Sequence, residues 1–266
     1  MNRELLARTF VATVKHSPLS RGRGRKAILK VLQKIHPEPL PSTFRGVPFL
    51  FHLDNTTERK ALLSDAYDTA ELDFLTGFVC KSPSTFIDIG ANSGLYSLYL
   101  ASRMPPGSRV YAVEPNPEMC RRVSANAELL REKGLAPGVA IEIRKLAIGA
   151  ASGVAYLDLS LGLGPAFLAD EKGESTLSVN VMTLLGFCRD NAIGSIGAIK
   201  IDVESYEDRV LLPFLSAART ELLPRALIFE TVHRNHWERD AVAACLEAGY
   251  AITGKTRSSI LMTLRS

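Results

Sequence analysis

Apolar runs and amphipathic stretches alternate along the chain from residue 85 onward. The apolar runs have the length and composition of buried strands and fall at 85–90, 109–115, 139–149, 198–203 and 225–231. The stretches with helical spacing fall at 94–103, 117–133, 206–218 and 237–248. Strands that alternate with helices indicate a parallel sheet with helices on both faces. The pattern therefore predicts an α/β domain.

Two segments depart from this alternation. Residues 151–160 and 175–184 are rich in strand-forming residues and flank a loop, which predicts a hairpin or an extended lid. The segment Gly249 to Leu264 predicts a final antiparallel hairpin that turns between Gly254 and Ser258.

The N-terminal part of the chain has a different character. The proline-rich segment Pro37 to Ser42 indicates a boundary, so we divide the chain into a basic helical extension with linker (1–42) and a main domain (43–266). Within the main domain, residues 47–53 predict a strand and 56–79 predict helical structure.

Positive charge is concentrated in residues 1–35. This segment has nine basic residues and one acid, a net charge of +8, so the remainder of a chain of net +4 carries −4. Such a segment can contact an acidic membrane surface, a nucleic acid or an anionic substrate. A helical extension with solvated charges is the simpler interpretation. We expect no nucleic-acid partner and keep peripheral membrane contact as a hypothesis. The glycines in RGRGRK (Arg21 to Lys26) disfavour the continuous amphipathic helix of a transit peptide.

Composition favours a globular protein of a reducing compartment. The chain of 266 residues is 46% hydrophobic and 23% charged. Its four cysteines are scattered and lack the spacing of a disulfide framework or a zinc site. No apolar run reaches the roughly 18 residues of a membrane span, and no signal peptide is apparent. These features predict a soluble, cytoplasmic protein.

The first predicted strand runs into a turn of small residues. Asp88, Gly90, Asn92 and Gly94 form the pattern D-x-G-x-N-x-G, in which glycines allow the backbone to approach a ligand and a helix N-terminus supplies N–H donors. The pyrophosphate fingerprint G-x-G-x-x-G is not met, because Asn92 and Leu95 replace its later glycines. The turn indicates a nucleoside site, with tight packing alone as the alternative.

An acid follows this turn at a characteristic distance. Glu114 comes twenty residues after Gly94, at the end of the second strand, where a carboxylate can accept hydrogen bonds from both ribose hydroxyls. The charge of Asp88 suits a cationic ligand such as the sulfonium of S-adenosylmethionine and would repel a pyrophosphate. Asp88 can also bind the amides of its own turn.

Three motifs in order resemble the FkbM family of S-adenosylmethionine-dependent methyltransferases. They are IDIGANSGLYSLYLA, VYAVEPNPE and IKIDVESYEDRVL. The resemblance extends from about Val47 to Thr263. It implies a class I methyltransferase (Rossmann-like) fold: a seven-stranded, mostly parallel sheet with helices on both faces and a reversed C-terminal hairpin. It also implies O-methylation of a sugar, glycan or secondary-metabolite hydroxyl.

The resemblance also implies a cofactor site. Asp88, Gly90, Asn92, Ser93 and Gly94 would hold the methionine and ribose portions, and Glu114 the ribose hydroxyls. Pro115 and Asn116 would lie beside the adenine. Ala147 would also lie near it, where related enzymes place an acid, so backbone groups are expected to recognise the ring.

One position of the third motif departs from the family pattern. Ser205 stands where the family usually has glycine. Serine does not adopt a positive φ without cost, so we expect the backbone to differ locally.

Candidate catalytic groups end the fourth and fifth strands. Asp202 is the first choice for contact with cofactor or acceptor, followed by Glu230 and His233. Lys200, inside an apolar strand, is either part of a structural ion pair or a base with a lowered pKa.

Acids near these groups have other interpretations. Glu204 and Glu207 can cap the helix that follows, and Asp202, Glu204, Glu230 and His233 can converge on a divalent cation. Catalysis without a metal is the preferred interpretation, because the spacing does not require one.

The acceptor site has weaker candidates. Tyr67, Glu71 and the loop 162–172 can form its walls. Two alternatives to methyl transfer are a dinucleotide-dependent oxidoreductase and a non-catalytic nucleoside-binding module anchored by the basic N-terminus.

Overall fold

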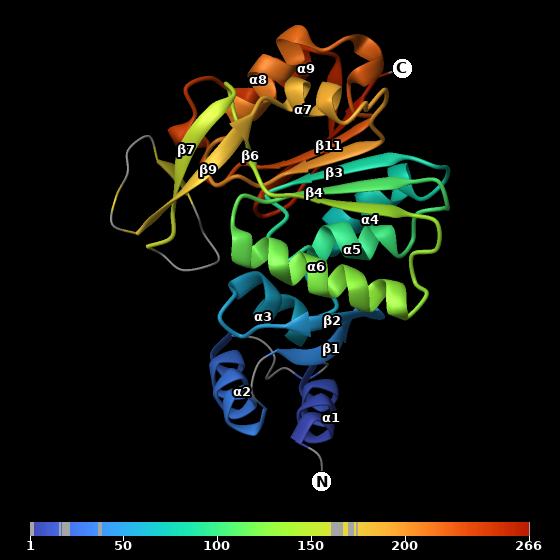
Figure 1. The fold of residues 1–266 in the computed structure, drawn as a ribbon, viewed down its shortest axis with the longest axis vertical. Coiled ribbons are helices and arrows are strands. Elements are labelled where there is room, and N and C mark those ends of the chain that lie inside the picture. Colours follow the sequence, from blue (N-terminus) through green and yellow to red (C-terminus); the bar gives the residue numbers. More distant parts are fainter. Residues whose placement is uncertain are drawn as a thin grey trace.

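The structure, a computed structural model, describes residues 3–15, 17, 22–36, 39–160, 167–169, 173 and 175–265. Its centre is a seven-stranded sheet with the order β12-β13-β11-β10-β3-β4-β5 (Figure 1). The strands are β3 (Thr85–Ile89), β4 (Arg109–Val113), β5 (Ala140–Arg144), β10 (Ala198–Ile201), β11 (Ala226–Glu230), β12 (Tyr250–Lys255) and β13 (Ser259–Leu264). β13 pairs antiparallel with both neighbours, and the pairs among the other strands are parallel. The predicted class I methyltransferase fold with its reversed final hairpin is confirmed.

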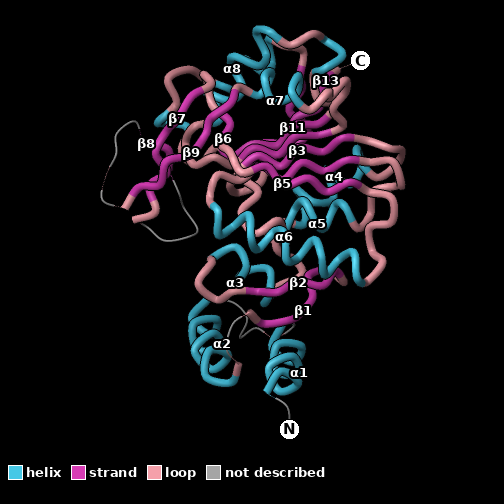
Figure 2. Tube along the Cα trace, in the orientation of Figure 1, coloured by secondary structure: helices cyan, strands magenta, loops and turns pink. Residues whose placement is uncertain are grey.

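Helices cover both faces of this sheet (Figure 2). One face carries α4 (Thr69–Val79), α5 (Leu95–Ala101) and α6 (Pro117–Glu132), and the other carries α7 (Leu184–Asp190), α8 (Glu207–Ala217) and α9 (Ala241–Glu247). Alternate residues of a strand point to opposite faces. In β3, Phe86 belongs to the core on the α5 side, whereas Ile87 and Ile89 belong to the core on the α7 side. Asp88 shares the face of Phe86, and this placement fixes its contacts.

The apolar pattern predicted a single strand at 139–149, but the structure has two strands there. The chain bends after β5, and β6 (Ala147–Ile148) leaves the main sheet for a second one with the order β6-β9-β7-β8. Here β7 (Gly153–Asp158) pairs antiparallel with β9 (Thr176–Met182) and with β8 (Phe167–Ala169), so the predicted hairpin is present.

Several helix boundaries also differ from the prediction. The helical stretch 56–79 is two helices, α3 (Thr56–Leu63) and α4, and the helix predicted from residue 237 begins at Ala241, after the short 3-10 turn η3 (Arg234–His236). Helix α7 was not predicted; it begins at Leu184, the last residue of the segment 175–184 that was expected to be extended. Its start is set by Thr183, whose side chain accepts a hydrogen bond from the Gly186 N–H.

An N-terminal module packs under α6. We define it as α3 and the antiparallel hairpin of β1 (Leu40–Phe44) and β2 (Val47–Phe51), residues 40–63. The boundary predicted after residue 42 falls inside β1 and therefore does not separate two folded units. Figure 1 shows the module between α6 and the first two helices, α1 (Arg3–Lys15) and α2 (Gly22–Ile35).

The helices α1 and α2 belong to the core cluster of this end of the molecule. Val11, Ile28 and Leu32 are buried in it, so most of the apolar side of α2 is covered by protein, and Val31 is its exposed apolar residue. Its exposed side carries Lys26, Lys30 and Lys34. A membrane contact of α2 would therefore depend on charge rather than on insertion of its apolar stripe.

Among the described residues, we find no helix that is both long enough and apolar enough to cross a bilayer.

Candidate active site

A cavity of about 430 Å³ lies at the carboxyl ends of β3, β4, β10 and β11. Strand order reverses between β3 and β10, and ligands of open α/β sheets bind at such a switch point. Most of the residues predicted to hold a cofactor line this cavity: Gly90, Asn92, Glu114, Pro115, Asn116, Ala147 and Asp202. The predicted catalytic residues Lys200 and Glu230 line it too.

Gly90 is required by the contact between two strand ends. It has φ +74°, and a Cβ atom added to it would overlap the Asp202 carbonyl oxygen. Any side chain would therefore push the end of β10 away from the turn after β3. Gly94 has a similar restriction, because an added Cβ would lie 2.9 Å from Val123 Cγ1 on α6.

Asn92 connects the turn to two other parts of the molecule. Its backbone N–H donates to Glu114 Oε2 at 2.8 Å, and its Oδ1 accepts a hydrogen bond of 2.7 Å from Asn55 Nδ2. The same Oδ1 accepts from the Ser93 N–H, and Asn92 itself has φ +51°. Asparagine tolerates this left-handed conformation better than most residues.

Glu114 is buried at the base of the cavity. Its Oε1 accepts a hydrogen bond of 2.9 Å from the Asn116 N–H, so that each carboxylate oxygen holds one backbone amide. Burial raises the pKa of Glu114 to about 7, although these two hydrogen bonds oppose the shift. Next to it, Asn116 Nδ2 is buried and has no hydrogen-bond partner among the described residues. Both side chains have bonding capacity left for a ligand.

Three of the predicted cofactor residues do not line the cavity: Asp88, Ser93 and Gly94. Asp88 is fully buried on the α5 side, where its Oδ2 accepts hydrogen bonds from the N–H and the hydroxyl of Ser97, at 3.1 and 2.7 Å. Its Oδ1 lies 3.5 Å from Lys200 Nζ. The charge of Asp88 is thus balanced inside the protein, and the argument that it attracts a cationic ligand is wrong.

Lys200 is a permanent cation in this arrangement. Its Nζ donates to the Gly90 carbonyl at 2.9 Å and lies 3.3 Å from Asp202 Oδ2. Burial alone would lower the pKa of Lys200, but the charges of Asp202 and Asp88 outweigh it and raise this pKa above its ordinary value. Of the two interpretations of Lys200, the structure supports the ion pair and contradicts the base.

A second group of side chains gathers where β10 and β11 end. Glu204 and Glu230 line the cavity, and His233 lies beside them with Nε2 3.9 Å from Glu204 Oε2. Burial raises the pKa of Glu230 to about 8, and the charge of Asp202 adds to the shift. Burial, followed by the charge of Asp202, also raises the pKa of Glu204. The structure brings these three residues together, whereas Asp202 pairs with Lys200.

Glu207 fastens the two loops that carry this group. Its Oε1 accepts from the Val203 N–H at 3.2 Å, and its Oε2 accepts from the Trp237 indole N–H at 3.0 Å. The next residue, Asp208, accepts from the backbone N–H of Glu238 at 2.9 Å. The acids at the start of α8 therefore hold the loop after β11 in place, a role beyond the predicted helix capping.

Ser205 does not avoid the positive φ that glycine would favour. It has φ +87°, and the preceding Glu204 has φ +50°. The expectation of a locally different backbone is not met, since the serine occupies the left-handed region. Two successive residues in this region store strain at the edge of the cavity.

One of the residues that were predicted to surround the acceptor lines the cavity. Tyr67 does so together with Asp68, and Asp68 Oδ2 accepts a hydrogen bond of 2.9 Å from the Tyr96 hydroxyl. Glu71 is buried and does not line the cavity. The loop 162–172 lies outside the described residues except for 167–169.

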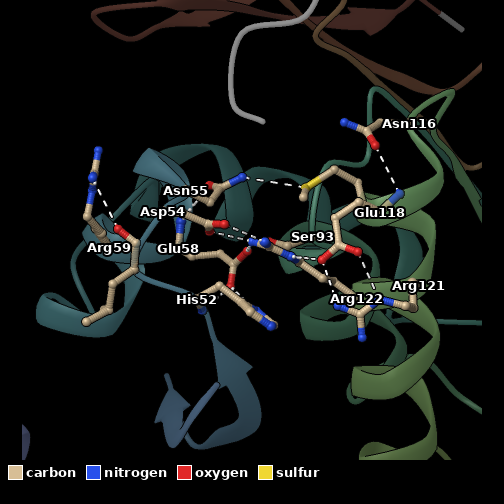
Figure 3. Close-up of polar contacts among 12 residues, drawn as sticks. His52, Asp54, Asn55, Glu58, Arg59, Ser93, Asn116, Glu118, Arg121 and Arg122 are labelled. Atoms are coloured by element: carbon tan, nitrogen blue, oxygen red, sulfur yellow. Dashed lines mark hydrogen bonds and ion pairs between the residues drawn. The ribbon is translucent and has the colours of Figure 1, made fainter. Parts of the chain in front are cut away.

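The N-terminal module reaches the cavity, which the sequence did not predict. Thr56, Thr57 and Lys60 of α3 line it, and the module is held to α6 by Arg122. Figure 3 shows this guanidinium facing the acids of the module and Glu118 of its own helix. Its ion pairs are 2.7 Å to Asp54, 3.0 Å to Glu58 and 2.9 Å to Glu118.

A local signal for the start of α3 is present in the sequence. Asn55 caps this helix by accepting from the N–H groups of Thr57 and Glu58, and an N-cap residue followed by Glu58 three positions later is the expected pattern. This signal indicates the helix but not its contact with Asn92, because that pairing joins distant parts of the chain.

Comparison with known proteins gives a curated relative and several solved structures. The curated protein "AMB antimetabolite synthetase AmbE" of Pseudomonas aeruginosa is 48% identical over 50 residues, which are 19% of this chain and 2% of that protein. The chain therefore spans only a small part of this relative. A solved FkbM methyltransferase from Methylobacillus flagellatus is 15% identical with a TM-score of 0.48, over 99% of this chain and 59% of that one. A precorrin-6y C5,15-methyltransferase from Geobacter metallireducens is 14% identical with a TM-score of 0.42, over 76% and 89% of the two chains.

The sequence model of the methyltransferase FkbM domain matches residues 88–251. The match begins at the acid that starts the turn motif and includes both strand ends that form the group around Glu230. It covers more than half of the chain, and the protein therefore belongs to the FkbM methyltransferase family.

Proposed function

We propose that the protein is an S-adenosylmethionine-dependent methyltransferase that methylates a hydroxyl of a sugar, glycan or secondary metabolite. Apart from the family match, this proposal is supported by the charged residues that line the cavity. Its described lining has five carboxyl side chains, Asp68, Glu114, Asp202, Glu204 and Glu230, against two lysines, Lys60 and Lys200. Burial raises the pKa of several of these carboxyl groups, because a further negative charge in the cavity is unfavourable. The same condition opposes the binding of a pyrophosphate and favours a cationic ligand. The balance thus weighs against a dinucleotide-dependent oxidoreductase.

The residues present fit a nucleoside cofactor. Glu114 would accept hydrogen bonds from the ribose hydroxyls, because each of its oxygens holds only one backbone amide. The Nδ2 of Asn116 would donate to the same ligand, which would satisfy a buried group that has no partner in the described structure. When bound, S-adenosylmethionine supplies an electrophilic methyl group on a sulfonium.

The acceptor would lie toward the ends of β10 and β11. Asp202 would orient the acceptor hydroxyl and take its proton, since its side chain lines the cavity and is about half exposed. Lys200 would hold this carboxylate through the 3.3 Å ion pair. Tyr67, which lines the same cavity, would offer an aromatic face to a sugar ring.

A methyl-transfer screen tests the proposal. The full chain would be incubated with methyl-labelled S-adenosylmethionine and panels of sugars, glycans and polyols. We expect label in one class of acceptor, a loss of about tenfold or more in Glu114→Gln, and no loss in the matched control Glu128→Gln on the exposed side of α6. Label in no hydroxylated acceptor, from protein that binds S-adenosylhomocysteine, would contradict hydroxyl methylation. Label incorporated equally by Glu114→Gln would contradict the assigned cofactor site.

A further inference from the structure

The carboxyl ends of β10 and β11 bring together two carboxylates and one imidazole. One ligand atom each of Glu204, Glu230 and His233 lies within 4.8 Å of the other two. We propose that these three side chains bind a divalent cation of the Mn²⁺ type, with its open positions toward the cavity. Its use in catalysis, which is to hold the acceptor hydroxyl oxygen, rests on the proposed methyl transfer.

The distances agree with shared coordination. An octahedral ion with metal–ligand bonds of about 2.1 Å keeps neighbouring ligand atoms about 3.0 Å apart and opposite ones about 4.2 Å apart. Glu204 Oε2 and His233 Nε2 are 3.9 Å apart, between these two separations. The ligand atoms of all three residues lie within 4.8 Å of one another, so changes of roughly 1–2 Å in these separations complete the geometry, and side-chain rotation can provide them.

No lysine or arginine of the described part of the chain forms an ion pair with these carboxylates. Among the described residues, Glu204 forms an ion pair with His233 alone, and Glu230 forms none with a lysine or arginine. The nearby Lys200 is engaged by Asp88, Asp202 and the Gly90 carbonyl. Half-buried carboxylates without a counter-ion are costly, and a bound cation would remove that cost.

The backbone holds the three ligands in place. Glu204 projects from a turn in which it and Ser205 have φ +50° and +87°. Glu230 is the last residue of β11 and pairs in register with Ser259. The loop with His233 is attached to the start of α8 by the hydrogen bond that the Trp237 indole N–H donates to Glu207. Strained backbone that is held by surrounding contacts is common where ligands are bound.

The donor set selects the kind of ion. Two carboxylates and one imidazole suit a first-row divalent cation better than Ca²⁺, which prefers oxygen ligands throughout. A structural zinc site would need a fourth protein ligand, and no further His or Cys belongs to the described cluster. Because Glu204 and Glu230 line the cavity, the open positions would face the acceptor.

Titration with Mn²⁺ alone, followed by electron paramagnetic resonance, tests the site. We expect one bound ion per full-length chain, and binding weakened about tenfold or more in Glu230→Gln and His233→Asn. The matched controls are His236→Asn, an exposed histidine three residues from His233, and Glu221→Gln, an exposed acid. Both should bind as the wild type does. Far-UV circular dichroism and the unfolding midpoint would establish that each variant is folded.

The outcome separates this proposal from the proposed function. Absence of Mn²⁺ binding, or equal binding by wild type, Glu230→Gln and His233→Asn, would overturn the metal site. S-adenosylhomocysteine would be titrated into the same samples. Binding of the nucleoside without Mn²⁺ would leave methyl transfer intact, whereas binding of Mn²⁺ without the nucleoside would support the metal site and contradict the cofactor.

Discussion

The side-chain amide of Asn55 donates a hydrogen bond of 2.7 Å to Asn92 Oδ1, and this bond joins the N-terminal module to the turn after β3. Asn92 in turn donates its backbone N–H to Glu114, the proposed ribose-binding residue. A segment that precedes the family match therefore reaches the candidate cofactor site through two hydrogen bonds.

Replacement of Asn55 tests this connection. Asn55→Asp keeps an acceptor for the cap of α3 but places a carboxylate against Asn92 Oδ1, so we expect S-adenosylhomocysteine affinity to fall about three- to tenfold with little loss of stability. Asn55→Ala also loses the cap and should lower the free energy of unfolding by about 1–2 kcal/mol. Calorimetric titration and denaturant unfolding measure the two effects.

The control for this experiment is Asn180→Ala, which removes an exposed asparagine of β9. It should match the wild type in both measurements. If Asn55→Asp bound the nucleoside as the wild type does, the hydrogen bond between Asn55 and Asn92 would not contribute to cofactor binding.

The steric need for Gly90 can be separated from its positive φ. Gly90→Ala should lower the free energy of unfolding by more than about 3 kcal/mol, because its Cβ would overlap the Asp202 carbonyl. Gly46 has a similar φ of +83° with nothing near the added Cβ, so Gly46→Ala should cost only about 1 kcal/mol. Equal losses in denaturant unfolding would show that the close contact does not matter.

The strain at Ser205 predicts a stabilising substitution. Its φ of +87° costs a serine more than a glycine. We expect Ser205→Gly to raise the free energy of unfolding by up to about 1 kcal/mol, since relief of this strain exceeds the added entropy of the unfolded chain. A thermal unfolding midpoint at or below that of the wild type would contradict the strain.

The raised pKa of Glu114 predicts pH-dependent cofactor binding. The ionised carboxylate accepts hydroxyl hydrogen bonds, and with a pKa of about 7 its population rises through neutrality. S-adenosylhomocysteine affinity should therefore increase about tenfold from pH 6 to pH 8. Glu114→Gln should bind weakly and without this dependence. A wild-type affinity that is flat over this range would show that Glu114 does not contact the ligand as an anion.

The same group affects stability in the opposite direction. Its pKa is higher in the folded protein, about 7, than the ordinary value of 4.5, so the folded state keeps the proton longer. The contribution of Glu114 to the free energy of unfolding is therefore largest below about pH 4.5 and declines as the pH rises to about 7. Glu114→Gln should remove this decline from a series of denaturant unfolding curves.

The strand pattern predicted the central sheet because buried parallel strands are short, apolar and separated by helices. It did not separate β5 from β6, since an apolar run at 139–149 gives no sign of which sheet its last residues join. It also gave no sign of β1, whose Pro41 falls in a segment that indicates a linker.

The candidate site was predicted where a motif sets a local geometry, as for Gly90 and Glu114. It was not predicted where a contact depends on two distant segments. The charge of Asp88 was assigned to a ligand, but strand register places it opposite Lys200. The contact between Asn55 and Asn92 likewise follows from how the N-terminal module packs on α6.

The central claim is that the cavity beside Glu114 binds the cofactor of methyl transfer. Calorimetric titration of the full chain with S-adenosylhomocysteine, and separately with NAD, tests it most directly. The account predicts binding of one S-adenosylhomocysteine per chain, lost or strongly weakened in Glu114→Gln and unchanged in Glu128→Gln, with no binding of NAD. Binding of NAD but not of S-adenosylhomocysteine would contradict it.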